Sequence, residues 1–329
     1  MQVRLASFLM IAACGYPALP KLGGGSDGAP GDGSGGGSGD GSSSATDCLQ
    51  RWFDGGAGLA FSTPQEINTM PGSANDRDPW ISADGFRLYF DRNPGEQGKS
   101  DIYFASRPSL EQDFAKPSLV GNLDTFDNEE RASLNGDETL LVFSGDHSTS
   151  GGQFQLFVSK RSGADPFPSP SVPDQMLVAG VNINNNDYFD PFLTKDGLRL
   201  YLAPSLGGAP QQIVVATRTS TEQNFSASVP VPVINSGSGD ANPSVTRDDR
   251  ILVFSSRRPP GVSGLGGANL WYATRQSPAD DFSTPQLIPT VNGNAEDDDP
   301  MLSADGCDLY FSSTRNGGKY HLFHASMTR

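Results

Sequence analysis

The sequence predicts an all-β fold, a five-bladed β-propeller made of four-stranded antiparallel blades. Three observations support this prediction: a motif that occurs five times, the same strand pattern around each copy, and a composition with 39 Gly and 25 Pro in 329 residues. Many short strands joined by turns suit this composition better than helices do, and the sequence has no long apolar helical stretch.

The repeated motif combines Asp-Pro, a Ser-x-Asp-Gly or Thr-x-Asp-Gly turn and a strand rich in large apolar residues. Clear copies occupy residues 78–90, 190–202 and 299–311, and degraded copies occupy 132–143 and 242–254. Successive copies end 53, 59, 52 and 57 residues apart, and we expect this variation to lie in loops. Asp-Gly between alternating apolar residues predicts a tight hairpin, because Gly tolerates the positive φ of the turn.

Two further strands are expected after each hairpin. The third strand is visible in every copy, at residues 102–107, 156–161, 213–218, 270–275 and 322–326. A fourth follows a Phe and a Pro in four copies: Phe114 with Pro117, Phe167 with Pro170, Phe225 with Pro230, and Phe282 with Pro285. Four antiparallel strands per repeat of this length are typical of a propeller blade.

Closure of the ring can also be predicted, because the fifth copy ends after its third strand. Residues 61–67 match residues 282–288 at six of seven positions, and the latter contain a predicted fourth strand. The N-terminal segment should therefore supply the missing strand of the last blade, which leaves no free sheet edge. In combination, these motifs resemble the WD40-like Asp-Pro repeat of TolB-type propellers over roughly residues 61–329. This resemblance implies the fold and very little about function, and TolB itself resembles a six-bladed ring.

The first 45 residues are expected to lie outside the propeller, which should occupy residues 46–329. Residues 1–14 end in Ile11-Ala12-Ala13-Cys14, which resembles the lipobox of bacterial lipoproteins and implies that Cys14 carries lipid. An ordinary cleaved signal peptide that contains Cys14 is the alternative. Residues 15–45 hold a Gly/Ser-rich stretch, typical of a flexible tether. We expect an exported protein, either an outer-membrane or periplasm-facing lipoprotein or one at the cell surface.

The charge restricts the partners. The formal net charge is -15, from 38 acidic and 23 basic side chains, and such a surface repels nucleic acid and anionic lipid. We expect a monomer that contacts the membrane through its lipid anchor only, and no nucleic-acid partner. A protein or an envelope polymer is the expected partner.

An acidic rim is the main candidate binding site. The loops between the fourth strand of one blade and the first strand of the next should bring these carboxylates to one face: Asp76, Asp78, Asp127, Glu129, Asp187, Asp190, Asp240, Asp297 and Asp299. The loops between the second and third strands should add Arg92, Arg257 and Arg315 to that face. Two alternatives remain open, namely structural Asp–Arg pairs between loops, or a surface that binds a cation or a cationic partner. Ca²⁺ is the one candidate cofactor, because dense carboxylates suit a hard cation.

Catalytic motifs are missing from the sequence. It contains no Gly-x-Ser-x-Gly elbow, no His-Glu-x-x-His and no phosphate-binding glycine loop. The leading hypothesis is a binding scaffold. The alternative is a carbohydrate-active enzyme, glycosidase-like or lyase-like, that uses carboxylates at the mouth of the central channel. Two or three inward carboxylates with aromatic neighbours would favour the enzyme, and a broad rim would favour the scaffold.

A disulfide between Cys48 and Cys307 is predicted. These are the two cysteines that remain once Cys14 is assigned to lipid, and an exported chain meets an oxidising compartment. Cys307 follows the Asp305-Gly306 turn of the last blade, and the closing strand should enter that blade from the same end. Two unpaired thiols are the alternative.

Overall fold

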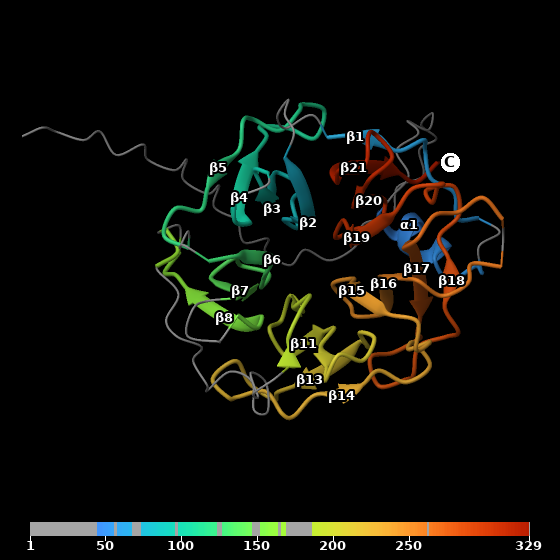
Figure 1. Ribbon diagram of the computed structural model, residues 1–329. Helices are drawn as coiled ribbons and strands as arrows, with labels where there is room; N and C mark the ends of the chain where they lie inside the picture. The colour runs from blue at the N-terminus through green and yellow to red at the C-terminus, as the bar shows by residue number, and fades with distance from the viewer. Residues whose placement is uncertain are drawn as a thin grey trace, which may run out of the picture.

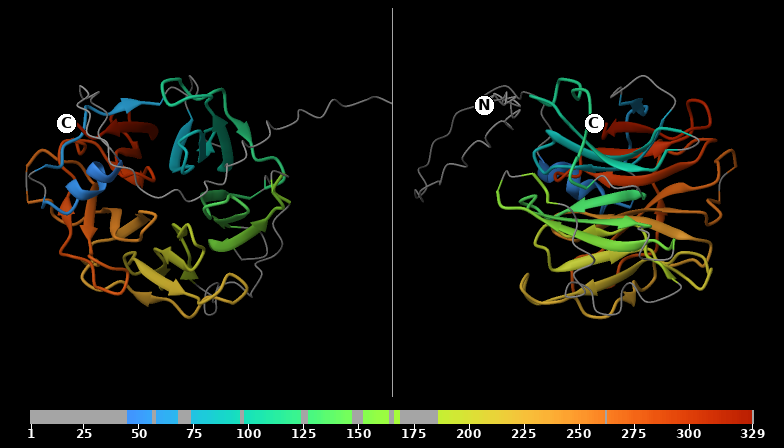
Figure 2. Two further views of the ribbon diagram at one scale, coloured as in Figure 1. Left: turned by 180° about the vertical axis from the view of Figure 1, so that it is seen from behind. Right: turned by 60° about the vertical axis from the view of Figure 1, so that its left-hand side comes forward.

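The computed structural model describes residues 45–55, 58–67, 74–95, 98–123, 127–146, 152–163, 166–168, 186–261 and 263–328. Within these residues, five antiparallel sheets stand around one central axis as the blades of a propeller (Figures 1 and 2). The predicted fold class is therefore confirmed. Cys14 and the predicted tether, except for Ala45, lie outside the described residues. No helix in the described part of the chain is long and apolar enough to cross a membrane.

In blades 1 to 4 the strands run from innermost to outermost in chain order, and in blade 5 the outermost strand is the N-terminal β1. Blade 1 contains β2 (Asn75–Ile81), β3 (Arg87–Asn93), β4 (Asp101–Ser106) and β5 (Ser118–Leu119). Blade 2 contains β6 (Glu129–Leu134), β7 (Leu140–Gly145) and β8 (Gln155–Lys160). The fourth strand expected in blade 2, near Pro170, lies outside the described residues.

The remaining blades follow the same plan. Blade 3 contains β10 (Phe192–Leu193), β11 (Arg199–Leu202), β13 (Val214–Thr217) and β14 (Val229–Pro230), and a small extra ladder joins β9 (Asn186–Asp187) to β12 (Ser205–Leu206). Blade 4 contains β15 (Asp240–Val245), β16 (Ile251–Ser256), β17 (Asn269–Thr274) and β18 (Gln286–Leu287). Blade 5 contains β19 (Asp297–Leu302), β20 (Asp308–Ser313), β21 (His321–Ser326) and β1 (Gln65–Glu66).

The second strand of each blade carries the core. All side chains of β7 and β16 are buried, because neighbouring blades cover both faces of a propeller sheet. The aromatic residues that end the repeat motif, such as Phe143 and Phe311, are fully buried. They stack on third-strand aromatic residues of the same blade, with ring centroids 5.5 Å apart for Phe143–Phe157 and 5.8 Å apart for Phe311–Phe323. Packing within and between blades thus explains why large apolar residues recur at the end of each copy of the motif.

The Asp-Gly turns join the first and second strands as predicted. In blade 1, Ser82 Oγ donates a hydrogen bond to Asp84 Oδ1 at 2.5 Å, and the same oxygen accepts from the Phe86 N–H at 3.1 Å. Gly85 between them has φ +75°, a conformation that side chains other than Gly rarely adopt. The same pattern recurs in blades 3 and 5.

A recurrent arginine at the end of the third strand forms what we call the turn clamp. Arg107, Arg161, Arg218 and Arg275 each donate Nε to a carbonyl oxygen of the first turn of their own blade, at 2.8, 2.7, 2.6 and 2.8 Å. Each guanidinium also stacks on the Phe that precedes the fourth strand, at 4.5, 4.2, 4.4 and 4.1 Å from the ring centroid. The clamp ties the outer segment of the blade to its first turn, so these arginines have a structural role.

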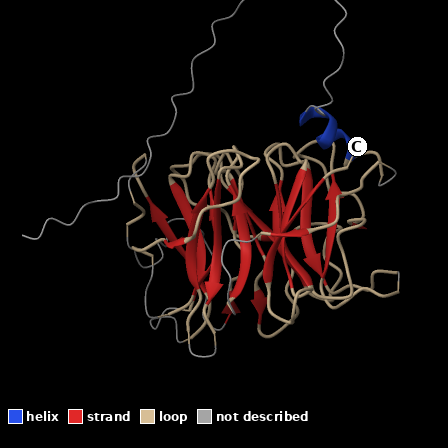
Figure 3. Cartoon of the chain, turned by 90° about the horizontal axis from the view of Figure 1, so that it is seen from above, coloured by secondary structure: helices blue, strands red, loops and turns tan. Residues whose placement is uncertain are grey.

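The N-terminal strand closes the ring, as predicted. Gln65 pairs with His324 and Glu66 with Phe323 in an antiparallel ladder, and Phe61 forms a bridge with Met327. The segment before it, α1 (Ala45–Arg51) and Trp52, packs on the same blade and is here called the N-terminal clasp. Cys48 and Cys307 form a disulfide, with Cα atoms 5.1 Å apart. Figure 3 shows α1 and the C-terminus together at one end of the propeller.

Candidate functional site

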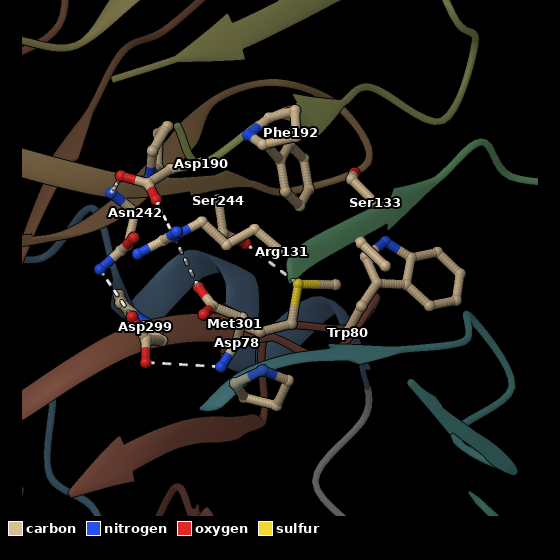
Figure 4. Close-up of a pocket in the computed structure, with 15 residues that line it drawn as sticks. Asp78, Trp80, Arg131, Ser133, Asp190, Phe192, Asn242, Ser244, Asp299 and Met301 are labelled. Carbon is tan, nitrogen blue, oxygen red and sulfur yellow. Dashed lines mark hydrogen bonds and ion pairs between the residues drawn. The ribbon is translucent and has the colours of Figure 1, made fainter. Parts of the chain in front are cut away.

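The first residue of each Asp-Pro motif, or its counterpart, lies on the central axis and has a left-handed backbone. These five residues are the channel ring, and their φ values are 51° for Asp78, 60° for Arg131, 57° for Asp190, 52° for Asn242 and 54° for Asp299. In four blades the ladder between the first two strands shifts register at this point, which is typical of a β-bulge. The bulge turns the ring side chains toward the axis, where all five line one pocket (Figure 4).

The channel ring is a closed cycle of polar contacts with one member from each blade. Arg131 Nε lies 2.6 Å from Asp190 Oδ1 and 3.8 Å from Asp78 Oδ1. The Asp78 N–H donates to Asp299 Oδ2 at 3.4 Å, and Asn242 Nδ2 donates to Asp299 Oδ1 at 2.7 Å. The Asn242 N–H donates to Asp190 Oδ2 at 3.2 Å, which completes the cycle (Figure 4). The Arg131–Asp190 contact is an ion pair without hydrogen-bond geometry.

A second layer of charged residues lies directly against the ring. Arg77 donates Nε to Asp299 Oδ2 at 3.1 Å and Nη2 to Asp298 Oδ2 at 3.0 Å. Arg131 Nη1 donates to Glu130 Oε2 at 2.6 Å. Both guanidinium groups stack on aromatic rings, Arg77 on Tyr320 at 4.2 Å and Arg131 on Phe189 at 4.9 Å. These stacks hold the two cations in fixed orientations.

The other side of the ring is more apolar and tightly filled. Its neighbours there include Trp80, Phe192 and Met301, each two residues after a ring member (Figure 4). The space left among them is about 40 Å³, enough for a few water molecules at most. The channel is therefore polar at one end and nearly closed beyond the ring.

Burial shifts the acidity of the ring and its neighbours. It raises the pKa of Asp190 to about 6, although Arg131 opposes the shift. It raises the pKa of Asp91, which accepts a hydrogen bond from the Arg131 N–H, to about 7, with the charge of Glu130 adding to the effect. Burial alone would raise the pKa of Asp299 too, but the charge and hydrogen bond of Arg77 hold it below its ordinary value.

A cavity of about 470 Å³ opens onto the polar side of the ring, and we call it the mouth cavity. Its charged and larger polar lining residues are Arg77, Arg131, Arg257, Asp190, Asp298, Asn242, Gln211 and Tyr320. Residues 205–211 and 238–239, from loops that join strands and blades, form much of its outer wall. The clasp contacts a turn between first and second strands, so it lies at the opposite end of the propeller.

Several residues of the predicted rim are instead buried in ion pairs within a blade. Asp76 Oδ2 lies 2.5 Å from Arg92 Nη2, with side-chain exposures of 12% and 5%. Asp297 pairs with Arg315 in the same way and is fully buried, and in blade 4 the fully buried Asp240 pairs with Arg258 at 2.6 Å. Of the two alternatives left open by the sequence, these residues follow the structural one, because the paired strands bring each carboxylate against an arginine of its own blade. The pairing alternative describes them.

The other predicted rim residues are scattered. Asp78, Asp190 and Asp299 belong to the channel ring, and Glu129 is fully buried at the start of β6. Asp187 accepts from the Phe154 N–H at 2.9 Å, and Asp127 is half-buried outside the ring. Arg257 makes an exposed pair with Glu296 at 2.9 Å and lines the mouth cavity. Within the described ranges, no group of three or more His, Cys, Asp and Glu is arranged to hold a metal ion.

Sequence reasoning missed Arg77, Asp91, Arg131 and Asn242 as site residues. A signal existed for two of them. Aligned on their second strands, the degraded copies place Arg131 and Asn242 where the clear copies have the Asp of Asp-Pro. In a degraded repeat the positions that differ from the motif are therefore informative. Here the replacement of Asp by Arg131 and Asn242 changes the charge of the channel ring.

Comparison with known proteins supports the fold. No family model and no curated protein matches the chain. The catalytic domain of an α-L-arabinofuranosidase from Coprinopsis cinerea is 11% identical with a TM-score of 0.55, covering 82% of this chain and 98% of that one. A β-xylosidase is 16% identical with a TM-score of 0.52, covering 80% and 94%. TolB from Acinetobacter baumannii is 13% identical with a TM-score of 0.43, covering 78% and 56%, which is too distant to support an argument. At these identities the likeness shows the propeller fold alone.

Proposed function

We propose that this chain is an exported, lipid-anchored propeller that acts as a binding scaffold at the cell envelope. Its ligand, a protein or an envelope polymer, docks at the mouth cavity. The observation that carries this proposal is the saturation of the cavity carboxylates by partners from the protein itself. When the carboxylates of a site are paired with other residues of the protein, the site keeps a fixed shape, as a binding site needs. Few carboxylates are then available to transfer a proton to or from a ligand.

Asp190 and Asp298 illustrate this saturation. Asp190 uses Oδ1 for Arg131 and Oδ2 for Gln211 Nε2 and the Asn242 N–H, both at 3.2 Å. Asp298 accepts from Arg77 on Oδ2 and from Asn242 Nδ2 on Oδ1 at 2.7 Å. A general acid or base must reach the ligand with a free oxygen. The protein's own donors hydrogen-bond to three of these four oxygens, and the fourth, Asp190 Oδ1, is buried in the ion pair with Arg131.

The position of the clasp fits an anchored scaffold. The polypeptide enters the propeller through α1, at the end opposite the mouth cavity. A lipid on Cys14 attaches through that end, which leaves the cavity on the far side from the membrane. The ligand then reaches the cavity from solution.

Capture experiments with the purified full chain test the proposal. Envelope extract is passed over wild-type protein and over Gln211→Arg, which places a long side chain in the mouth cavity. Gln112→Arg, at an exposed position near the clasp end, is the matched control. We expect Gln211→Arg to reduce capture of a specific component at least tenfold, and Gln112→Arg to leave it unchanged. Equal capture by all three proteins would show that the cavity is not the docking site.

Glycoside hydrolysis is the second candidate, and two observations favour it. The first is that the channel ring brings three inward carboxylates, Asp78, Asp190 and Asp299, beside the aromatic residues Trp80 and Phe192, which is the arrangement expected of an enzyme. The second concerns acidity. Asp190 and Asp298 line the same cavity, and burial raises the pKa of both, that of Asp190 to about 6. A carboxyl that keeps its proton near neutral pH can act as a general acid. Turnover of aryl glycosides by wild type, abolished in Asp190→Asn, would establish the enzyme and remove the scaffold proposal. We expect no turnover.

A further inference from the structure

The mouth cavity holds hydrogen-bond donors that the protein does not use. Arg77 bonds through Nε and Nη2, and among the described residues its Nη1 has no acceptor. Arg131 bonds through Nη1 and pairs through Nε, and its Nη2 has no acceptor in the same residues. Their side chains are 26% and 16% exposed. The two guanidinium groups come from neighbouring blades and line one cavity.

The same cavity also has an unused acceptor. Gln211 donates Nε2 to Asp190 and to the Ala203 carbonyl, so its Oε1 is the end that remains for a ligand. The neighbouring Asn242 Oδ1 also accepts no hydrogen bond, but it is buried away from the cavity surface and a ligand does not reach it.

The charge around the cavity disfavours an ionic ligand. Six carboxylates, Asp78, Asp91, Glu130, Asp190, Asp298 and Asp299, surround the guanidinium groups of Arg77 and Arg131. The cavity lining itself holds three arginines, Arg77, Arg131 and Arg257, and two aspartates, Asp190 and Asp298. Each of these arginines is already paired with a carboxylate of the protein, so an anion would have to compete with that partner. A cation would find carboxylate oxygens that already have partners. A neutral ligand avoids both penalties.

Resting on the proposed function, we propose that the mouth cavity binds a neutral, polyhydroxylated unit, namely a sugar residue of an envelope polymer, without cleaving it. A hydroxyl group both accepts and donates. Adjacent hydroxyls can therefore accept from Arg77 Nη1 and Arg131 Nη2, and one of them can donate to Gln211 Oε1. The apolar faces of the sugar find Ala209, Pro210 and Ala268 in the remaining wall.

The size of the cavity agrees with this ligand. Its volume of about 470 Å³ lies within the usual range for small-ligand sites, roughly 300–1,000 Å³. The filled channel beyond the ring stops entry at that depth. The cavity thus accepts an end or a side branch of a chain, which enters from the outer loops.

Titration of the full chain with methyl glycosides of pentoses, hexoses and N-acetylhexosamines tests this inference. Binding is followed by calorimetry and by the NMR shifts of the Gln211 side-chain amide. We expect at least one neutral glycoside to bind with millimolar or tighter affinity. Gln211→Ala should weaken it about tenfold, the loss of one well-placed hydrogen bond. Ala209→Trp, which narrows the entrance at an exposed position, should abolish it, and Gln112→Ala should leave it unchanged.

Sodium acetate and methylammonium chloride, at equal ionic strength, separate the alternatives. Competition by acetate would assign an anion site, competition by methylammonium would assign a cation site, and either result overturns the inference. So does the absence of binding by every glycoside. If Gln211→Arg still abolishes capture of a protein component that no glycoside displaces, the scaffold proposal stands and the sugar inference fails. If neither capture nor glycoside binding occurs, both fail.

Discussion

Blades 1 to 4 and blade 5 fasten their outer segments in different ways. In the first four, the turn clamp arginine ends the third strand, as at Arg275, whose N–H donates to the Arg250 carbonyl. The equivalent N–H in blade 5 belongs to Met327 and donates to Cys307. Met cannot donate a side-chain hydrogen bond to the turn. Trp52 from the clasp replaces it: Trp52 Nε1 donates to the Gly306 carbonyl at 3.0 Å, where Arg107 and Arg218 use Gly85 and Gly197.

The stacking partner is replaced as well. Phe61 occupies the position of the clamp phenylalanines, and its ring lies 5.7 Å from the Trp52 ring. The disulfide at Cys307 then holds the clasp to the same turn. The clamp in blades 1 to 4 joins residues about 20 apart in the chain, whereas the Trp52–Gly306 bond joins residues 254 apart. The closing blade therefore exchanges a local fastening for a long-range one, and its stability depends on the far end of the chain.

Removal of residues 45–67 should have the largest effect on stability, because it removes the whole long-range fastening of blade 5. The deletion exposes the edge of β21 and removes Trp52, Leu59 and Phe61 from the apolar cluster of blades 4 and 5. We expect a loss of more than about 5 kcal/mol, which approaches the whole stability of a typical domain. Urea denaturation followed by circular dichroism measures it. A deleted chain that unfolds at the same urea concentration as wild type would refute closure by the N-terminal strand.

Trp52→Ala isolates the substitute for the clamp. The side chain is 1% exposed and contacts Phe61 and Tyr272, so its loss should cost about 3–5 kcal/mol in the free energy of unfolding. A second change in that background, Met327→Arg, supplies the residue that the other blades use. It should restore part of the loss, and no recovery would mean that position 327 is not the clamp position.

Loss of the disulfide should cost less, about 2–4 kcal/mol, because it acts mainly by constraining the unfolded chain. The double variant Cys48→Ser, Cys307→Ser is compared with wild type in thermal unfolding, with and without dithiothreitol. We expect the reductant to lower the Tm of wild type and to leave that of the double variant unchanged. A reductant effect of the same size on both proteins would contradict this role.

Arg218→Ala tests a local clamp. Within the described residues Arg218 makes no ion pair, and it donates hydrogen bonds to Gly197 and to the loop after β13, so the expected loss is about 2 kcal/mol. Urea unfolding measures this value beside that of Trp52→Ala. A larger loss in the free energy of unfolding for Arg218→Ala than for Trp52→Ala would contradict the view that the closing blade depends more on its fastening than the other blades do.

Asp91, which accepts a hydrogen bond from Arg131 of the channel ring, provides a control for the comparison, because the clasp should not influence its pKa. Burial raises the pKa of Asp91 to about 7, so the folded state binds a proton that the unfolded state has released. Stability from this group is present below about pH 4 and is lost as the pH rises toward 7, by at most about 1.4 kcal/mol per pH unit. Asp91→Asn should remove the part of this slope that comes from Asp91 and leave the part that comes from Asp190, whose pKa burial raises to about 6. The decrease should be the same with and without the disulfide. A slope that is unchanged in Asp91→Asn would show that Asp91 is already charged when folded.

Much of the fold could be predicted from sequence because its signals are local. Asp84-Gly85 fixes a turn, the alternation after it fixes a strand, and the match of Phe61–Ile67 to Phe282–Ile288 fixes the closure. The cysteine pair could be predicted because both residues approach one end of one blade, and the structure joins that pair. These inferences require only the position of each residue within its copy of the repeat.

The site could not be predicted in the same way. Asp76 and Asp78 look alike in sequence, yet one pairs with Arg92 inside its blade and the other faces the axis. The bulge between Arg77 and Trp80 separates them, and a simple strand pattern does not reveal a bulge. For Arg131 the alignment of the repeats marks the position but not the role, because that role depends on four residues from other blades that no local pattern connects.

The mixed composition of the channel ring has a consequence for how such a protein can arise by gene duplication. Five identical copies of the Asp-Pro repeat would bring five carboxylates to one axis, with no arginine among them. Repulsion between them would destabilise the closed ring unless protons or a bound cation neutralised it. The replacements at Arg131 and Asn242 therefore relieve a penalty that perfect internal symmetry would impose. A consensus propeller designed from blades 1, 3 and 5 alone would lack that relief, and its assembly should depend on acid or on metal.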